Sequence, residues 1–264
     1  MSFTHNLAEI CRKQNSLVCV GLDPDPLKIP NDIDVLTFCT EIIKATSPYA
    51  CAFKPNLAFF EALGVEGFSV LKEVLKAVPS DLITIADAKR ADIGNTASAY
   101  AKSIFDELGF DAVTLNPYMG HDSIEPFTRY DNKGLFILCR TSNTGATDFQ
   151  QLRLSDGRYL YEAVATKVNE WNTDKNMGLV VGATAPSELS IIRAMCPDLP
   201  FLIPGVGAQG ASVAQTVSNA INKEGLGVII NSSRQIIYAS NGADYASAAA
   251  LTAKSLRDEI NSYR

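Results

Sequence analysis

Histidine is scarce in this sequence and cysteine forms no pattern, and both facts limit what the protein can bind. Among the 264 residues the two histidines, His5 and His121, lie far apart. The six cysteines form no CxxC pair, and Cys19, Cys51 and Cys139 fall in or beside apolar runs, where a free thiol behaves as a small hydrophobic side chain. We therefore expect buried, reduced cysteines in a cytoplasmic protein rather than a disulfide scaffold or a zinc site.

Positive charge and long apolar runs are also lacking. The net charge is −6 with a pI near 5.0, and no basic stretch stands out, which argues against nucleic acid or an anionic membrane as a partner. No apolar run approaches the ~18–20 residues of a membrane helix. Residues 1–6 lack a basic region followed by an apolar core, so no signal peptide is expected. A small anionic ligand remains compatible with this composition, since a few local cations can bind it.

Eight short apolar runs alternate with helical segments along the whole chain, and this alternation predicts a parallel sheet. A length near ~250 residues and the lack of a Ser/Gly linker favour one domain over residues 1–264, a single (β/α)8 TIM barrel, over a doubly wound sheet. The predicted strands are residues 17–21, 50–54, 82–87, 111–115, 135–139, 177–181, 200–203 and 227–230. The predicted helices are residues 36–46, 65–78, 93–108, 158–171, 186–196, 211–222 and 243–260, with 120–130 as a weak candidate.

The stretch DAKRAD at residues 87–92 follows the third predicted strand and is the strongest candidate site. On an extended strand Asp87 and Lys89 point to the same side, and barrel enzymes keep their chemistry at the carboxyl ends of the strands. Lys54, at the end of the second strand, and Asp92 complete an array that alternates in sign. A lysine held between carboxylates stays charged, so it serves as a proton donor rather than a Schiff-base nucleophile. Asp92 has an alternative role as the N-cap of the next helix.

A second candidate site is the sequence PGVGAQG at residues 204–210, after the seventh strand. Together with Arg234 after the eighth strand, it predicts a phosphate site, because barrel enzymes often bind phosphate at these two loops. Gly207 lets the backbone approach the anion, Gln209 donates a hydrogen bond, and Arg234 can form a bidentate pair. The GxGxxG fingerprint of dinucleotide-binding folds is absent.

Two further polar residues at strand ends are candidate substrate ligands. Ser142 follows the fifth strand and is a better hydrogen-bond partner than nucleophile, since no histidine lies at a strand end to activate it. Asp23 can bind a sugar hydroxyl, although the sequence DPDP at residues 23–26 also suits an ordinary turn.

From residue 21 to residue 234 the chain resembles the orotidine 5′-monophosphate decarboxylase family, in its longer bacterial-type subgroup. The matching motifs are the hallmark D-x-K-x-x-D-[IT]-G at residues 87–94 with Asn95 and Thr96 after it, FKPN at residues 53–56, the Ser142 loop, PGVGAQG, and an arginine after the eighth strand. The set in this order is far more specific than any single member. It implies decarboxylation of orotidine monophosphate to uridine monophosphate in pyrimidine biosynthesis, with no metal and no organic cofactor.

The resemblance also implies individual roles and a homodimer with shared active sites. Lys89 would donate the proton to C6, Asp87 would lie against the substrate carboxylate, and Lys54 would bridge the charges and the ribose. Asp92 and Thr96 would reach into the neighbouring subunit's site. The remaining ligands would be Asp23 for a ribose hydroxyl, Ser142 for the pyrimidine, and Gln209 with Arg234 for the phosphate. The chain departs from many relatives at Thr144, where proline is common, and at Ser233, where glycine is frequent.

Two alternatives remain open from the sequence. One is a Mg²⁺-dependent sugar-phosphate decarboxylase or synthase of the same barrel superfamily, which shares D-x-K-x-x-D but places a carboxylate where this chain has Lys54. The other is a non-catalytic protein that binds a nucleotide phosphate on the same scaffold.

Overall fold

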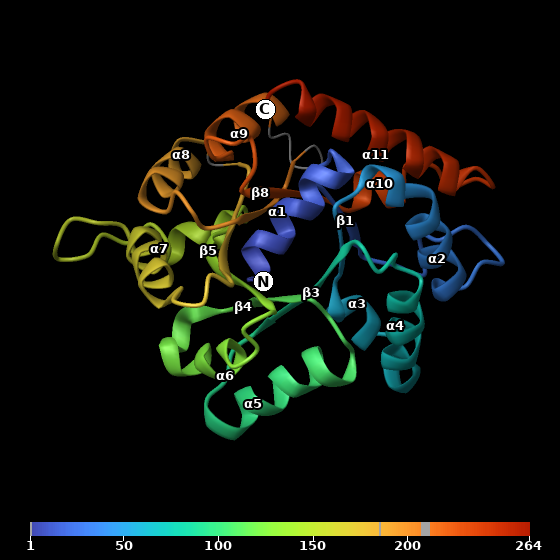
Figure 1. Ribbon diagram of the computed structural model, residues 1–264. Helices are drawn as coiled ribbons and strands as arrows, with labels where there is room; N and C mark the ends of the chain where they lie inside the picture. The colour runs from blue at the N-terminus through green and yellow to red at the C-terminus, as the bar shows by residue number, and fades with distance from the viewer. Residues whose placement is uncertain (1, 185, 207–211) are drawn as a thin grey trace.

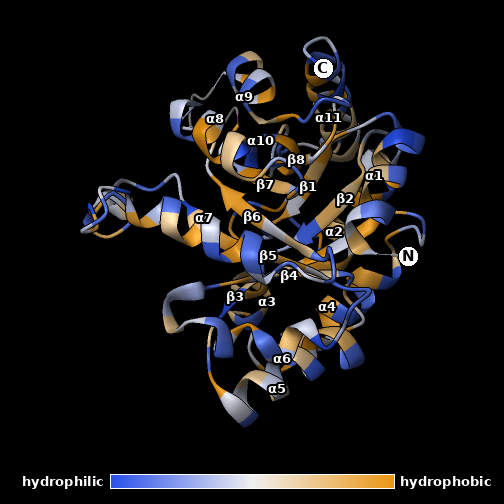
Figure 2. Ribbon diagram, turned by 60° about the vertical axis from the view of Figure 1, so that its left-hand side comes forward, coloured by the Kyte–Doolittle hydropathy of each residue, from blue (hydrophilic) through white to orange (hydrophobic). Residues whose placement is uncertain are grey.

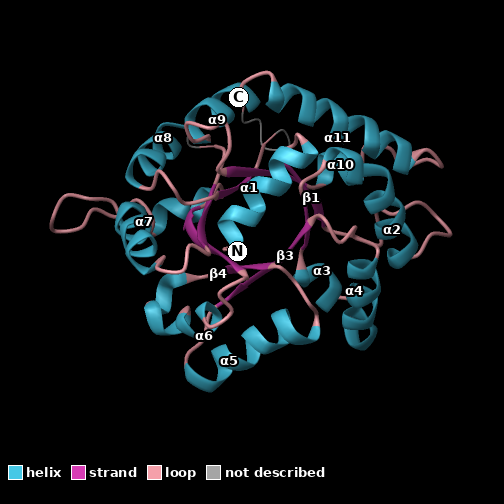
Figure 3. Ribbon diagram, in the orientation of Figure 1, coloured by secondary structure: helices cyan, strands magenta, loops and turns pink. Residues whose placement is uncertain are grey.

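The computed structural model describes residues 2–184, 186–206 and 212–264, and within them eight parallel strands close into a barrel. The strands follow one another in chain order, and β8 pairs back onto β1 (Figure 1, Figure 3). The predicted TIM barrel is therefore confirmed, with strand ends that differ by a few residues at most. The strands are β1 Val18–Leu22, β2 Ala52–Pro55, β3 Ile83–Arg90, β4 Ala112–Leu115, β5 Gly134–Arg140, β6 Met177–Val181, β7 Phe201–Pro204 and β8 Val228–Ser232.

Helices surround the barrel, and each of the seven predicted helices is found. They are α2 Val35–Thr46, α4 Gly67–Lys76, α5 Gly94–Lys102, α7 Leu160–Trp171, α8 Pro186–Met195, α9 Val213–Ala220 and α11 Tyr245–Asn261. A π-helical turn, Ser103–Glu107, continues α5. The prediction missed α1 Phe3–Gln14, α3 Leu57–Glu61 and α10 Arg234–Ile237, and the weak segment 120–130 holds the short α6 Glu125–Thr128. Short 3₁₀ turns complete the chain at Ser47–Tyr49, Gly64–Glu66, Pro117–Met119, His121–Ser123 and Thr144–Asp148.

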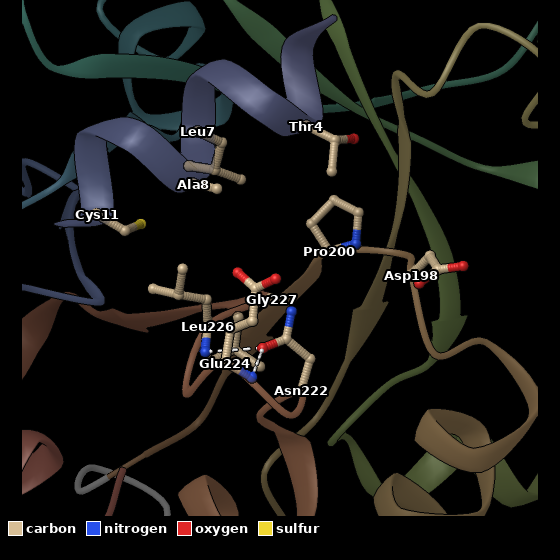
Figure 4. Close-up of a pocket in the computed structure, with 11 residues that line it drawn as sticks. Thr4, Leu7, Ala8, Cys11, Asp198, Pro200, Asn222, Glu224, Leu226 and Gly227 are labelled. Carbon is tan, nitrogen blue, oxygen red and sulfur yellow. Dashed lines mark hydrogen bonds between the residues drawn. The ribbon is translucent and has the colours of Figure 1, made fainter.

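Helix α1 closes the amino-terminal end of the barrel. Figure 1 shows it lying across that end, and the ring of Phe3 packs edge-on against Phe136 of β5 at 6.0 Å. A Cβ at Gly134 would stand 2.4 Å from the same Phe3 ring, so only glycine admits this contact. The cavity left between α1 and the loops holding Pro200 and Leu226 measures about 50 Å³ (Figure 4). Helix α1 therefore covers this end of the barrel (Figure 1).

The barrel interior is apolar, and the strands accordingly stand out as hydrophobic between the mixed faces of the helices (Figure 2). All six cysteines lie within the described ranges, and each is buried and free of a disulfide, as predicted. Burial raises the pKa of Cys19 and of Cys39 to about 12, which keeps both thiols protonated and inert. Over the residues that the structure describes, no helix combines the length and the hydropathy that spanning a membrane requires.

Candidate active site

Three of the four predicted charges meet at the carboxyl ends of β2 and β3. Lys54 Nζ lies 2.5 Å from Asp87 Oδ2, and Lys89 Nζ lies 2.5 Å from Asp87 Oδ1. The Lys54 side chain is 5% exposed and that of Asp87 11%, whereas the Lys89 side chain is 51% exposed. One carboxylate therefore holds two ammonium groups, and only Lys89 reaches toward solvent.

The two lysines keep Asp87 charged, and Asp87 keeps Lys54 charged. Burial raises the pKa of Asp87, but attraction to Lys54 and Lys89 outweighs it and holds this pKa well below its usual 3.8. Burial lowers the pKa of Lys54, but attraction to Asp87 and to Asp23 outweighs it, so this pKa lies above 10.5. These directions agree with an ionised Lys54–Asp87 pair.

Strand β3 is not regular where it carries these charges. Ala86 pairs with Val113 and Arg90 with Leu115, so four steps along β3 face two steps along β4. Lys89 has a φ of 47°, in the left-handed region that few residues other than glycine occupy. Asp87 and Lys89 therefore meet through a bulge rather than through the simple alternation of an extended strand, and bulges of this kind often re-aim side chains at active sites.

Among the described residues, neither Asp92 nor Thr96 forms an ion pair or a hydrogen bond with this cluster. Asp92 Oδ1 accepts a hydrogen bond from the N–H of Ile93 at 2.8 Å, and Thr96 is exposed on α5. The alternative of Asp92 as a helix N-cap is wrong, because α5 has Ile93 in that position and no side-chain cap. The helix begins at Gly94, which has a φ of 55°, one residue later than predicted.

Two adjoining cavities open at this end of the barrel and share Lys54, Asp87 and Pro204. The smaller, of about 170 Å³, is lined also by Asp23 and Arg234. The larger, of about 450 Å³, falls in the usual range for ligand pockets and is lined also by Lys89, Thr114, Leu138, Ser142, Gln150, Val180 and Leu202. The structure thus brings the predicted residues from β1, β2, β3, β5 and β8 around one cleft. Gly207 and Gln209, predicted for phosphate binding, lie outside the described residues.

The loop that carries Asp23 is tied to the helix that carries Arg234. Tyr238, directly after α10, accepts a hydrogen bond from the N–H of Asp25 at 2.7 Å and donates one to the carbonyl of Asp23 at 2.8 Å. Asp23 Oδ1 and Asn231 Oδ1 are buried and, among the described residues, have no hydrogen-bond partner. Buried polar atoms are nearly always satisfied, so both acceptors are suited to the hydroxyl groups of a ligand.

Close packing explains why Gly21 precedes this loop. A Cβ at Gly21 would lie 1.8 Å from Ser233 Oγ and 3.0 Å from Asn231 Oδ1. Ser233, which precedes Arg234, therefore occupies space that Gly21 leaves empty.

The Ser142 loop is held by a residue that the sequence did not single out. Gln150 accepts a hydrogen bond from the N–H of Thr141 and donates one to its Oγ1, both at 2.8 Å. Arg140, at the end of β5, is 9% exposed and pairs with Glu188 of α8 at 2.8 Å. These contacts fix the chain on one side of Ser142, and Thr144 begins a 3₁₀ turn on the other. No local pattern marks Gln150, because its partner lies nine residues away in a loop.

A TIM barrel that gathers a Lys–Asp–Lys cluster and polar strand-end side chains around one cleft has the layout of a barrel enzyme. A family model described as "Orotidine 5'-phosphate decarboxylase / HUMPS family" matches residues 16–249. The chain belongs to this family.

Similar proteins cover the chain end to end. A protein of Dehalococcoides mccartyi named orotidine 5′-phosphate decarboxylase is 52% identical over 267 residues, covering 100% of this chain and 99% of its own. A Roseiflexus castenholzii protein of the same name is 49% identical, covering 99% and 98%. The solved structure of Leishmania donovani OMP decarboxylase has a TM-score of 0.87 at 44% identity and covers 100% of this chain and 98% of its own.

Proposed function

We propose that this protein decarboxylates orotidine 5′-monophosphate to uridine 5′-monophosphate in pyrimidine biosynthesis. The observation that carries the proposal is the Lys54–Asp87–Lys89 cluster at the mouth of the barrel, in a chain of the decarboxylase family. The similar proteins whose names state this activity match the chain over its full length.

In the proposed reaction the C6–carboxylate bond breaks, CO₂ leaves, and the electron pair remains on C6 until Lys89 protonates it. The negative charge of Asp87 would lie against the substrate carboxylate and favour its departure as neutral CO₂. Lys54, buried and paired with Asp87, would hold that carboxylate in place and reach the ribose. The orbital that holds the C6 electron pair does not overlap the π-system of the ring, so electrostatic stabilisation has to replace delocalisation.

Lys89 alone does not supply the stabilisation that such a reaction needs. An ammonium ~3 Å from the carbanion at an effective dielectric constant of ~20 contributes about 5–6 kcal/mol. Large enzymatic accelerations require up to ~23 kcal/mol. The remainder is assigned to the preorganised charges and to remote binding energy from the phosphate.

The phosphate and ribose would occupy the smaller cavity and the pyrimidine the larger one. Asp23 and Arg234 line the smaller cavity, which supports their roles at a ribose hydroxyl and the phosphate. Ser142 lines the larger cavity together with Lys89, which supports a hydrogen bond from Ser142 to the ring. Gln209, with the backbone at Gly207, completes the proposed phosphate site.

A homodimer with shared sites is part of the proposal. Asp92 and Thr96 are absent from the residues that line either cavity of the single chain, as expected if they serve a partner's site. Ile93, Tyr118 and Met119 follow the neighbouring strands β3 and β4 and are 50%, 83% and 45% exposed. Exposed apolar side chains of this size on adjacent loops suit a protein interface.

We propose that the reaction needs no metal. Both oxygens of Asp87 are occupied by ammonium groups, and the cation Lys54 stands where the Mg²⁺-dependent relatives need a carboxylate. In the part of the chain that the structure describes, no group of three His, Cys, Asp or Glu side chains is placed to hold a metal ion. We also propose that residues 1–264 act as one domain and that the protein is cytoplasmic, consistent with six free, buried thiols.

A decarboxylation assay tests the proposed activity and its independence of metal. Purified protein should convert orotidine monophosphate to uridine monophosphate and CO₂, at the same rate before and after exhaustive EDTA treatment. Activity lost to EDTA and restored by Mg²⁺ would support the metal-dependent alternative. Tight binding of uridine monophosphate without turnover would support the non-catalytic one.

A further inference from the structure

Thr114 lies beside the charged cluster, on β4, and its side chain is almost fully buried at 2% exposure. Its Oγ1 accepts hydrogen bonds from the N–H groups of Ala88 and Lys89, each at 3.0 Å. The same hydroxyl donates to Asp87 Oδ1 at 3.1 Å. Three consecutive residues of the β3 bulge therefore converge on one side-chain oxygen of the neighbouring strand.

The direction of each of these hydrogen bonds follows from the chemistry of the hydroxyl group. A threonine hydroxyl has one hydrogen and two lone pairs. The two N–H groups take both lone pairs, so the single hydrogen points at Asp87, whose ionised carboxylate is an acceptor only. The hydroxyl has no capacity left for a substrate, so its influence on the reaction passes through the residues that it holds.

The bulge needs such an anchor. It places Lys89 at a φ of 47°, which a lysine adopts only when its surroundings impose it. The hydrogen bonds to two successive N–H groups hold that backbone, and the bond to Asp87 Oδ1 holds the oxygen that Lys89 Nζ contacts at 2.5 Å. Backbone and side chain of the proton donor are thus positioned from the same point.

We propose that Thr114 is a positioning residue that sets the geometry of Lys89 and Asp87 for proton transfer to C6. This inference rests on the proposed function and adds to it a residue on β4. Loss of the hydroxyl would free the backbone at Ala88 and Lys89 and leave Asp87 one donor short. Misplacement of a reacting group by about 1 Å can cost about 10²-fold in rate.

Thr114→Val and Thr114→Ser test this role, because valine keeps the shape without the hydroxyl and serine keeps the hydroxyl. We expect kcat for orotidine monophosphate to fall about 10²-fold in Thr114→Val, and affinity for uridine monophosphate to stay within about threefold. Thr114→Ser should restore most of kcat. Thr114→Ala replaces the valine variant if the latter does not fold.

Thr84→Val is the matched control. Thr84 lies near the amino end of β3, the strand that carries the bulge. Thr84 Oγ1 donates to Asp111 Oδ2 at 2.8 Å and accepts from the Asp111 N–H at 3.1 Å, so this variant also loses a buried hydroxyl that makes more than one hydrogen bond. It should lower the resistance to urea and leave kcat within about twofold of the wild type, since Asp111 takes no part in the reaction.

The outcomes separate this inference from the proposed function. A wild-type protein that does not turn over orotidine monophosphate overturns the function and this role together. An active wild type with an equally active Thr114→Val overturns the positioning role alone. The same holds if Thr114→Ser loses as much kcat as Thr114→Val, or if Thr84→Val loses as much as either.

Discussion

Replacing Asp87 with asparagine should make the free energy of unfolding depend on pH above neutrality, where the wild-type Lys54–Asp87 pair contributes a constant amount. In the wild type the depressed pKa of Asp87 stabilises the fold above the unfolded value of ~3.9, and this stabilisation is lost as the pH falls through the folded pKa. The raised pKa of Lys54 stabilises the fold below ~10.4, and that stabilisation is lost as the pH rises through the folded pKa. Between these limits the pair contributes a constant amount.

In Asp87→Asn the Lys54 ammonium stays buried, since its side chain is 5% exposed, but the carboxylate closest to it is gone. The cost of burying its charge is then no longer offset by that carboxylate. Removing one member of a buried ion pair costs about 3–5 kcal/mol, mostly because a charge is left buried and unpaired. Above neutral pH Lys54 can relieve this cost by losing its proton, whereas the unfolded chain keeps that proton up to ~10.4. For each pH unit over which Lys54 is neutral in the folded variant but protonated in the unfolded chain, the variant regains about 1.4 kcal/mol of its free energy of unfolding.

The measurement is the free energy of unfolding in urea at pH 7, 8, 9 and 10 for the wild type and the variant. Groups that titrate in both proteins cancel in the difference, which we expect to shrink by about 2–3 kcal/mol from pH 7 to pH 10. Asp81→Asn is the control, since it breaks the exposed Lys13–Asp81 pair and should show no such trend. A difference for Asp87→Asn that stays constant over this range would refute the reasoning.

Four further predictions concern the proposed reaction. Lys89→Ala should abolish decarboxylation while binding of uridine monophosphate stays measurable, and near-normal turnover would exclude it as the proton donor. Arg234→Ala should reduce kcat/KM far more for orotidine monophosphate than for the nucleoside without phosphate, whereas equal losses would contradict its phosphate role. Mixing inactive Lys89→Ala and Asp92→Ala subunits should restore part of the activity if sites are shared, and mixed dimers without recovery would count against sharing. Gly21→Ala, whose Cβ would stand 1.8 Å from Ser233 Oγ, should raise KM by displacing the segment before Arg234, and an unchanged KM would show that the segment adapts.

The strands and the helices that cover them could be predicted because their patterns are local. Strands buried on both faces appear as short apolar runs, and helices repeat their buried positions with a 3.6-residue period. The same reasoning missed α1, whose buried residues Phe3, Leu7 and Cys11 pack across the amino-terminal end of the barrel rather than on its side (Figure 1). It also missed the short α3 and α10, which lie in loops at the carboxyl ends of β2 and β8.

The candidate site could be predicted in part for a related reason. Parallel strands of a barrel end at one rim. Polar residues at the strand ends, such as Lys54, Asp87 and Ser142, therefore converge whatever the details of packing. The bulge at Lys89 could not be predicted, because D-A-K is compatible with a regular strand. Thr114 also gave no signal, since a β-branched residue in a strand is usual and nothing nearby in sequence shows that its hydroxyl faces Asp87.

The sequence by itself determined the order of strands and helices, the chemical identity of the side chains at the barrel mouth, and the family to which the chain belongs. Only the tertiary structure decided that Asp87 holds Lys54 with one oxygen and Lys89 with the other, and that Asp92 pairs with neither lysine among the described residues of a single chain. Periodicity and strand order depend on neighbours along the chain. Ionisation, hydrogen-bond direction and the strained backbone of Lys89 depend instead on distance and burial, which are set by residues more than twenty positions away, such as Thr114.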